Sequence, residues 1–158
     1  MRVLKADKQM TWRSHLQISN KIEACNDRRT QDYGPPSRRI LVLDDEPMIL
    51  RVTARLLDKL GYESEVSTSG VETLARFRHA QESDEPFDAV ILDLTAPGDM
   101  GGLEVLRELK KLNPKTRAIL ASDYSEDRNY SVLGFSGQLR KPFMVSDVQR
   151  VLRKVLSQ

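Results

Sequence analysis

From Ile40 onward, short apolar segments alternate with segments whose apolar residues recur every three or four positions. The first segment, Ile40 to Leu43, is continuously apolar, which is typical of a strand covered on both faces. Four further strands are expected, at residues 62–67, 87–92, 117–121 and 137–140. Strand and helix thus alternate about five times, which predicts an α/β fold with a doubly wound, five-stranded parallel sheet and helices on both faces.

The segments between the strands carry helical patterns of unequal strength. The first expected helix begins at Pro47, ends at Gly61 and has a predicted buried face of Ile49, Val52, Leu56 and Leu60. The last expected helix opens at Ser146 and has a predicted buried face of Val148, Val151, Leu152 and Val155. Between the last two strands, residues 125–133 are polar and give only a weak helical signal.

Polar side chains follow four of the predicted strands. Asp44 and Asp45 follow the first, Asp93 the third, Ser122 the fourth and Lys141 the fifth. Because functional groups in open parallel sheets gather at the carboxyl ends of the strands, these side chains are expected to meet at one edge. Taken singly, each has a plainer interpretation, such as a helix cap, a turn residue or a solvated strand end.

Such a cluster favours chemistry on a phosphoryl group. Three adjacent carboxylates repel one another unless they bind a proton or a cation. Hard oxygen ligands suit Mg²⁺, and a carboxylate can attack phosphorus to form an aspartyl phosphate. Lys141 and the Ser122 hydroxyl could then neutralise or hydrogen-bond the phosphoryl oxygens.

The order and spacing of these pieces over about a hundred residues resemble a response-regulator receiver domain of two-component signalling. The matching motifs are Leu43-Asp44-Asp45-Glu46-Pro47, Leu92-Asp93-Leu94 with Pro97, Ser122, and Lys141-Pro142-Phe143. The loop at residues 93–102 is most similar to receivers attached to hybrid sensor kinases. The resemblance implies a flavodoxin-like (βα)5 receiver fold over residues 40–158.

The resemblance also implies a role for each matching residue. Asp93 would accept a phosphoryl group from a phosphohistidine on a histidine kinase or histidine phosphotransfer protein. Asp45, Asp93 and the backbone carbonyl of Thr95 would ligate Mg²⁺, with Asp44 acting mainly through a water molecule. Lys141 would pair with the phosphoryl oxygens, and Ser122 would move toward them to transmit the switch to a downstream protein.

Two positions depart from the family pattern. Asp123 stands after the switch hydroxyl, where a small residue is usual, and its charge is expected to hinder or repel the phosphoryl group. Gln138 stands three residues before Lys141, where family members often carry an aromatic residue. The usual coupling between the hydroxyl and an aromatic ring is therefore not expected in its ordinary form.

Residues 1–39 are expected to form a basic, flexible leader. They hold nine Lys or Arg against four Asp or Glu, whereas residues 40–158 hold sixteen against nineteen. Because residues 40–158 are mildly acidic, direct DNA binding by this domain is not expected. No apolar run approaches the length of a membrane span, and Cys25 is the only cysteine, so the expected location is the cytoplasm.

Three functions compete on this sequence. The favoured one is a phosphorylated regulator rather than an enzyme, as a single-domain protein, a relay intermediate or part of a hybrid kinase. No output domain follows Gln158, so a separate DNA-binding module is not expected. The second is a hydrolase like the haloacid-dehalogenase phosphatases, which Thr95 disfavours because a second aspartate stands there in such enzymes. The third is a receiver-like scaffold that is never phosphorylated.

Overall fold

The computed structural model describes residues 38–94, 100–123 and 129–157. Within these ranges the strands are β1 (Arg39–Leu43), β2 (Glu63–Ser67), β3 (Ala89–Asp93), β4 (Ala118–Asp123) and β5 (Gly137–Lys141). The helices are α2 (Pro47–Lys59), α3 (Gly70–Glu82), α4 (Gly102–Leu112) and α5 (Val145–Leu156). All strand pairs are parallel, in the order β2-β1-β3-β4-β5. The predicted five-stranded parallel sheet is confirmed.

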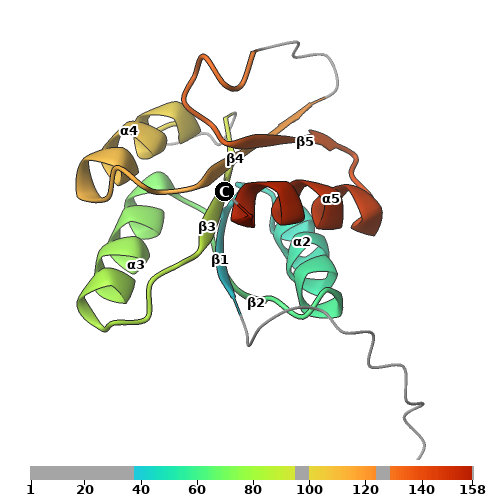
Figure 1. The fold of residues 1–158 in the computed structure, drawn as a ribbon, viewed down its shortest axis with the longest axis horizontal. Helices are drawn as coiled ribbons and strands as arrows, with labels where there is room; N and C mark the ends of the chain where they lie inside the picture. The colour runs from blue at the N-terminus through green and yellow to red at the C-terminus, as the bar shows by residue number, and fades with distance from the viewer. Residues whose placement is uncertain (1–37, 95–99, 124–128, 158) are drawn as a thin grey trace, which may run out of the picture. The chain divides into compact units, whose positions relative to one another are not determined.

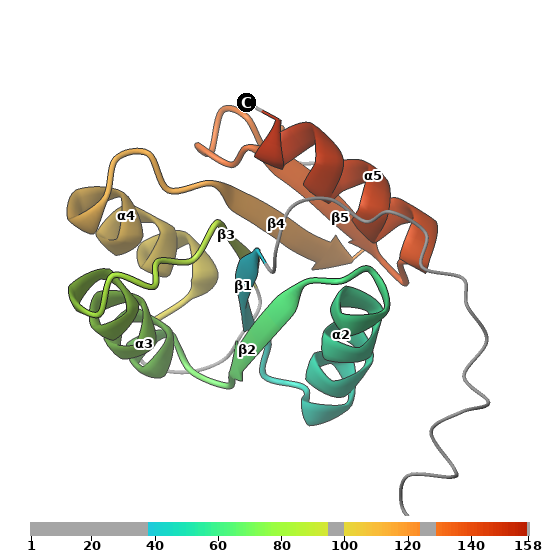
Figure 2. The ribbon, with the colours of Figure 1, turned by 60° about the horizontal axis from the view of Figure 1, so that its bottom comes forward.

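Helices cover both faces of this sheet. Helices α2 and α5 lie on one face, and α3 and α4 lie on the other (Figures 1 and 2). The chain leaves β1 toward β2 on one side and then returns past β1 to β3 on the other side. That change of direction between β1 and β3 creates the switch point at which doubly wound sheets place their functional residues.

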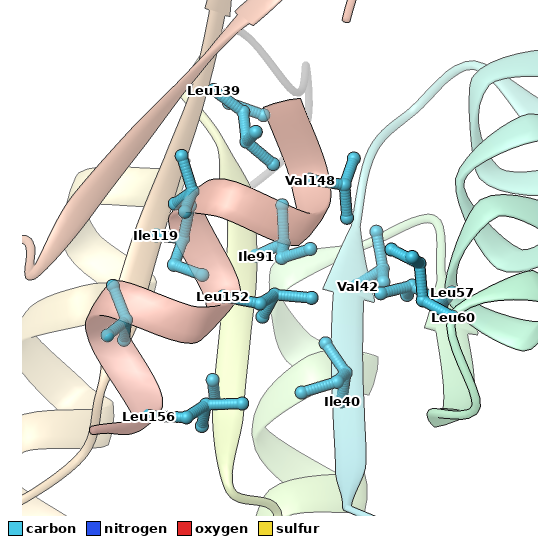
Figure 3. Close-up of a cluster of buried hydrophobic side chains, with 14 of the residues drawn as sticks. Ile40, Val42, Leu57, Leu60, Ile91, Ile119, Leu139, Val148, Leu152 and Leu156 are labelled. Atoms are coloured by element: carbon cyan, nitrogen blue, oxygen red, sulfur yellow. The ribbon is translucent and has the colours of Figure 1, made fainter. Parts of the chain in front are cut away.

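The core has two layers because the central strands are buried on both faces. Ile40 and Val42 of β1 point into the layer beneath α2 and α5, together with Ile91 and Leu152 (Figure 3). Alternate residues of the same strands face the layer beneath α3 and α4. This two-sided burial explains why the first strand reads as a continuous apolar run rather than as an alternating one.

The predicted buried face of α2 was wrong by one position along most of its length. Leu50, Thr53 and Leu57 are the buried residues of this helix, whereas Val52 is 48% exposed. The helix carries apolar residues on two adjacent stripes, so the spacing alone fits either stripe. For α5, by contrast, the four predicted positions are all buried, because its apolar residues form only one stripe.

The weak helical signal before β5 does not yield a helix in the described residues. Residues 124–128 lie outside the described ranges, and residues 129–134 form successive turns. The Phe135 N–H donates to the Tyr130 carbonyl, and Gly134 adopts a φ of +92°, in the left-handed region that ends helical turns. In the described part of this stretch the weak helical signal therefore corresponds to turns rather than to a helix.

The predicted leader falls almost entirely outside the described residues, and its boundary and flexibility stay predictions. Strand β1 begins at Arg39, one residue before the expected start of the domain. Among the residues that the structure describes, no helix combines the length and the apolar character needed to cross a membrane.

Candidate functional site

Three carboxylates meet at the carboxyl edge of β1 and β3. Leu43 pairs with Leu92 across these strands, so the residues that follow them, Asp44 and Asp93, become neighbours. Carboxylate oxygens of Asp44, Asp45 and Asp93 lie within 4.8 Å of one another. The sequence-based prediction that these side chains converge is confirmed.

Hydrogen bonds of its side chain and of its backbone N–H fix the position of Asp44. Its side chain is 2% exposed, and its Oδ1 accepts a hydrogen bond of 2.9 Å from the Glu46 N–H. Its backbone N–H donates to the Ser67 carbonyl oxygen at the end of β2. The short turn before Pro47 therefore fixes the direction of one carboxylate, while Asp45 is only half-buried and remains open to ligands.

Lys141 brings a positive charge to the two buried carboxylates. Its Nζ lies 2.7 Å from Asp44 Oδ2 and 3.2 Å from Asp93 Oδ2, although β5 lies two strands away from β3. Burial lowers the pKa of the ammonium, but the hydrogen bond to Asp44 and the charge of Asp93 outweigh it, so the pKa lies above its ordinary value. Lys141 therefore keeps its charge at neutral pH.

Ser122 is the penultimate residue of β4, the strand next to β3. Asp93 pairs with Ala121, so Ser122 is the next residue along the neighbouring strand. Its side chain is 2% exposed, and its Oγ accepts a hydrogen bond of 3.0 Å from Gln138 Nε2 on β5. Ser122 lies near the carboxyl end of β4, as predicted, and the contact with Gln138 was not predicted.

Comparison with known proteins identifies the family of this chain. The family model of the response regulator receiver domain matches residues 40–153. The chain belongs to the receiver domain family. It is 32% identical over 123 residues to the sensor kinase CckA of Brucella abortus, and the match covers 76% of this chain but 13% of that kinase. The receiver therefore corresponds to a small part of that relative.

Two solved receivers share the fold. A receiver domain protein from Clostridium thermocellum is 31% identical, with a TM-score of 0.65 over 76% of this chain and 94% of that one. The receiver domain of a sensor histidine kinase from Pseudomonas aeruginosa is 22% identical, with a TM-score of 0.66 over 77% of this chain and 99% of that one. The latter holds a magnesium ion in its active-site cleft.

The structure does not test the predictions made for three residues around the site, Thr95, Asp99 and Asp123. Thr95, whose backbone carbonyl was predicted to ligate Mg²⁺, lies outside the described ranges, as does Asp99. Asp123 is exposed at the end of β4. Its predicted effect on the phosphoryl group stays a prediction.

Gly102 ties the position of Asp93 to the start of α4. A Cβ at Gly102 would overlap the backbone carbonyl oxygen of Asp93 and lie 2.9 Å from its carbonyl carbon. A Cβ at the preceding Gly101 would meet nothing closer than the Leu94 carbonyl oxygen, at 3.9 Å. The absence of a side chain at Gly102 thus allows α4 to approach the backbone of Asp93.

We expect Gly102→Ala to destabilise this receiver by about 1–3 kcal/mol, because either α4 or the end of β3 has to move. Urea unfolding measures this loss, and calorimetric titration with Mg²⁺ shows whether the carboxylates are displaced. Gly101→Ala is the matched control and should change stability by less than about 1 kcal/mol. Equal effects of the two substitutions would contradict the proposed close approach.

Proposed function

We propose that this receiver is a phosphorylation-dependent switch of a two-component or phosphorelay system, with Asp93 as the phosphoryl acceptor. The observation that carries this proposal is the buried pair Asp44 and Asp93, bridged by the Lys141 ammonium, with Asp45 alongside. A carboxylate held next to a fixed cation can act as nucleophile while the cation offsets charge on the incoming group. Family membership supports the same assignment.

The proposed donor is a phosphohistidine on a histidine kinase or on a histidine phosphotransfer protein. An Asp93 carboxylate oxygen forms a bond to phosphorus as the bond between phosphorus and the histidine nitrogen breaks. The released imidazole nitrogen takes up a proton, and Asp93 becomes an acyl phosphate. Lys141, now between Asp44 and Asp93, is placed to transfer its contact from the carboxylate to the phosphoryl oxygens.

The donor atoms at this edge fit Mg²⁺. Among the described residues, the cluster consists of three carboxylates, and Mg²⁺ prefers such hard oxygen ligands together with water and phosphate. Asp45 and Asp93 would ligate the ion directly, with the Thr95 carbonyl, and Asp44 would act through water. When bound, the ion supplies positive charge beside the equatorial phosphoryl oxygens. The magnesium in the Pseudomonas receiver supports this proposal.

The chain is proposed to be a regulator and not an enzyme that turns over a separate substrate. Its output would be an altered surface read by a downstream protein, without direct contact to DNA or to a membrane. Cytoplasmic action agrees with the single cysteine. A hydrolase of the haloacid-dehalogenase type remains the main competing function, and Thr95 in place of a second aspartate argues against it.

The test uses the full 158-residue chain with Mg²⁺ and a small phosphodonor. Acetyl phosphate and phosphoramidate offer a P–O and a P–N bond, and the second imitates the bond in phosphohistidine. We expect intact-mass spectrometry to show one added phosphoryl group, which hydroxylamine removes because it is an acyl phosphate. Labelling should disappear with EDTA and in Asp93→Asn.

Absence of labelling with both donors in the wild-type chain would refute the switch. Label that persists in Asp93→Asn would place the acceptor elsewhere. Rapid turnover of generic phosphomonoesters by the wild-type chain would favour the hydrolase instead.

A further inference from the structure

A hydrogen bond from a neighbouring strand orients the Ser122 hydroxyl. Ser122 is 2% exposed, and Gln138 Nε2 donates a hydrogen bond of 3.0 Å to its Oγ. Gln138 belongs to β5, the strand next to β4, and Leu120, two residues before Ser122, is its pairing partner. Since alternate residues of a strand share one face, Gln138 and Ser122 are diagonal neighbours on the same face.

The direction of this hydrogen bond determines what Ser122 can do. A serine hydroxyl has one proton to donate and two lone pairs that accept. Because one lone pair accepts from the Gln138 amide, the hydroxyl proton stays available for another acceptor. Ser122 directly follows Ala121, the pairing partner of Asp93, so the hydroxyl belongs to the next residue along the strand beside the proposed acceptor.

We propose that Gln138 is a positioning residue for phosphoryl transfer, because its amide N–H orients the Ser122 hydroxyl to donate toward the phosphoryl oxygens on Asp93. The amide donor also polarises the hydroxyl and strengthens the hydrogen bond that the hydroxyl donates. A phenylalanine ring at the same position could not donate in this way. The inference rests on the proposed phosphorylation of Asp93 and adds a residue that acts through Ser122.

Gln138 can be replaced without disturbing the core. Its side chain is only half-buried and borders an open surface cavity of about 550 Å³, along with Arg140 and Arg150. Gln138→Glu keeps the size of the side chain and, when ionised, offers only acceptors. The Ser122 proton then turns toward residue 138 and away from Asp93. Gln138→Met keeps the length but provides neither donor nor acceptor.

The test measures the initial rate of labelling by acetyl phosphate in the full chain with saturating Mg²⁺. Losing one hydrogen bond to a charged phosphoryl oxygen corresponds to a rate lowered by about ten- to a hundredfold, which we expect for Ser122→Ala and Gln138→Glu. Gln138→Met should slow labelling by about threefold, since the hydroxyl loses its orientation but not its proton. Beryllofluoride affinity should fall in parallel, while Mg²⁺ affinity stays unchanged.

The decisive measurement is the labelling rate after Gln138→Glu or Gln138→Met in a chain that already carries Ser122→Ala. If Gln138 acts through Ser122, Gln138→Glu then slows labelling by less than about twofold further. Gln81→Glu on α3 is the matched control. It introduces the same charge at a half-buried glutamine near the end of a helix that runs back from the carboxyl edge of the sheet.

Three outcomes would overturn the inference while leaving the proposed function intact. Gln138→Glu could label as fast as the wild type, or Ser122→Ala could do so. Alternatively, the effect of Gln138→Glu could persist in full without the Ser122 hydroxyl, which would mean that the new negative charge acts directly on the site. If the wild-type chain is not labelled at all, the proposed function fails and the inference fails with it.

Discussion

Asp93→Asn is expected to lose all phosphoryl labelling and yet to give a more stable protein when no Mg²⁺ is present. The two effects have opposite signs because Asp93 is the proposed nucleophile and also one of three carboxylates whose oxygens lie within 4.8 Å. The amide cannot form the acyl phosphate, so labelling is abolished. The same change removes a buried charge that faces two like charges.

The gain in stability follows from the charges around Asp93. The side chain of Asp93 is almost fully buried, it faces Asp44 and Asp45, and it contacts Lys141 at 3.2 Å. Without the Asp93 charge, Lys141 keeps its shorter contact of 2.7 Å to Asp44. The substitution removes the repulsion from Asp44 and Asp45 together with the cost of burying a carboxylate, and we expect a net gain of roughly 1–2 kcal/mol.

Urea unfolding in EDTA and in Mg²⁺ checks this prediction. In EDTA the Asp93→Asn variant should unfold at higher denaturant than the wild type. In saturating Mg²⁺ the difference should shrink or reverse, because an ion that binds the native wild type more tightly stabilises it more. Asp58→Asn, at an exposed position of α2, controls for the general effect of removing a carboxylate. An Asp93→Asn variant that is less stable than the wild type in EDTA would contradict the repulsive cluster.

The sheet and its functional edge were predictable because the constraints on them are simple. A continuous apolar run such as residues 40–43 requires cover on both faces, and alternating helices supply it. Parallel strands end at the same edge, so residues that directly follow strands must converge there. This reasoning brought Asp44, Asp93 and Lys141 together from positions almost a hundred residues apart, as the structure bears out.

The features that could not be predicted depend on side-chain geometry within that frame. The buried face of α2 was assigned to the stripe containing Val52, because the adjacent stripe of Leu50 and Leu57 is interrupted by the polar Thr53. Gln138 was recognised only as the absence of an aromatic residue. Its bond to Ser122 depends on the register of β4 and β5, which the sequence does not specify to one residue.

Lys141→Met is expected to be the most damaging single substitution in the site. Its ammonium contacts Asp44 and Asp93, which are each 2% exposed, so its loss leaves two buried carboxylates facing each other. Removing one partner of a buried charge pair costs about 3–5 kcal/mol. Labelling by acetyl phosphate should also fall by about a hundredfold or more, because a fixed cation beside the phosphoryl oxygens is lost.

A second substitution separates these two roles of Lys141. In Lys141→Met with Asp44→Asn, one of the two carboxylates that faced Lys141 is replaced by a neutral amide, so most of the lost stability should return in urea unfolding without Mg²⁺. Labelling should not return, because no ammonium faces the phosphoryl group. Lys154→Met, at an exposed position of α5, is the control for removing a lysine. If the double variant regained labelling as well as stability, Lys141 would serve only to hold the carboxylates together, and phosphoryl transfer at Asp93 would depend on Mg²⁺ alone for its positive charge.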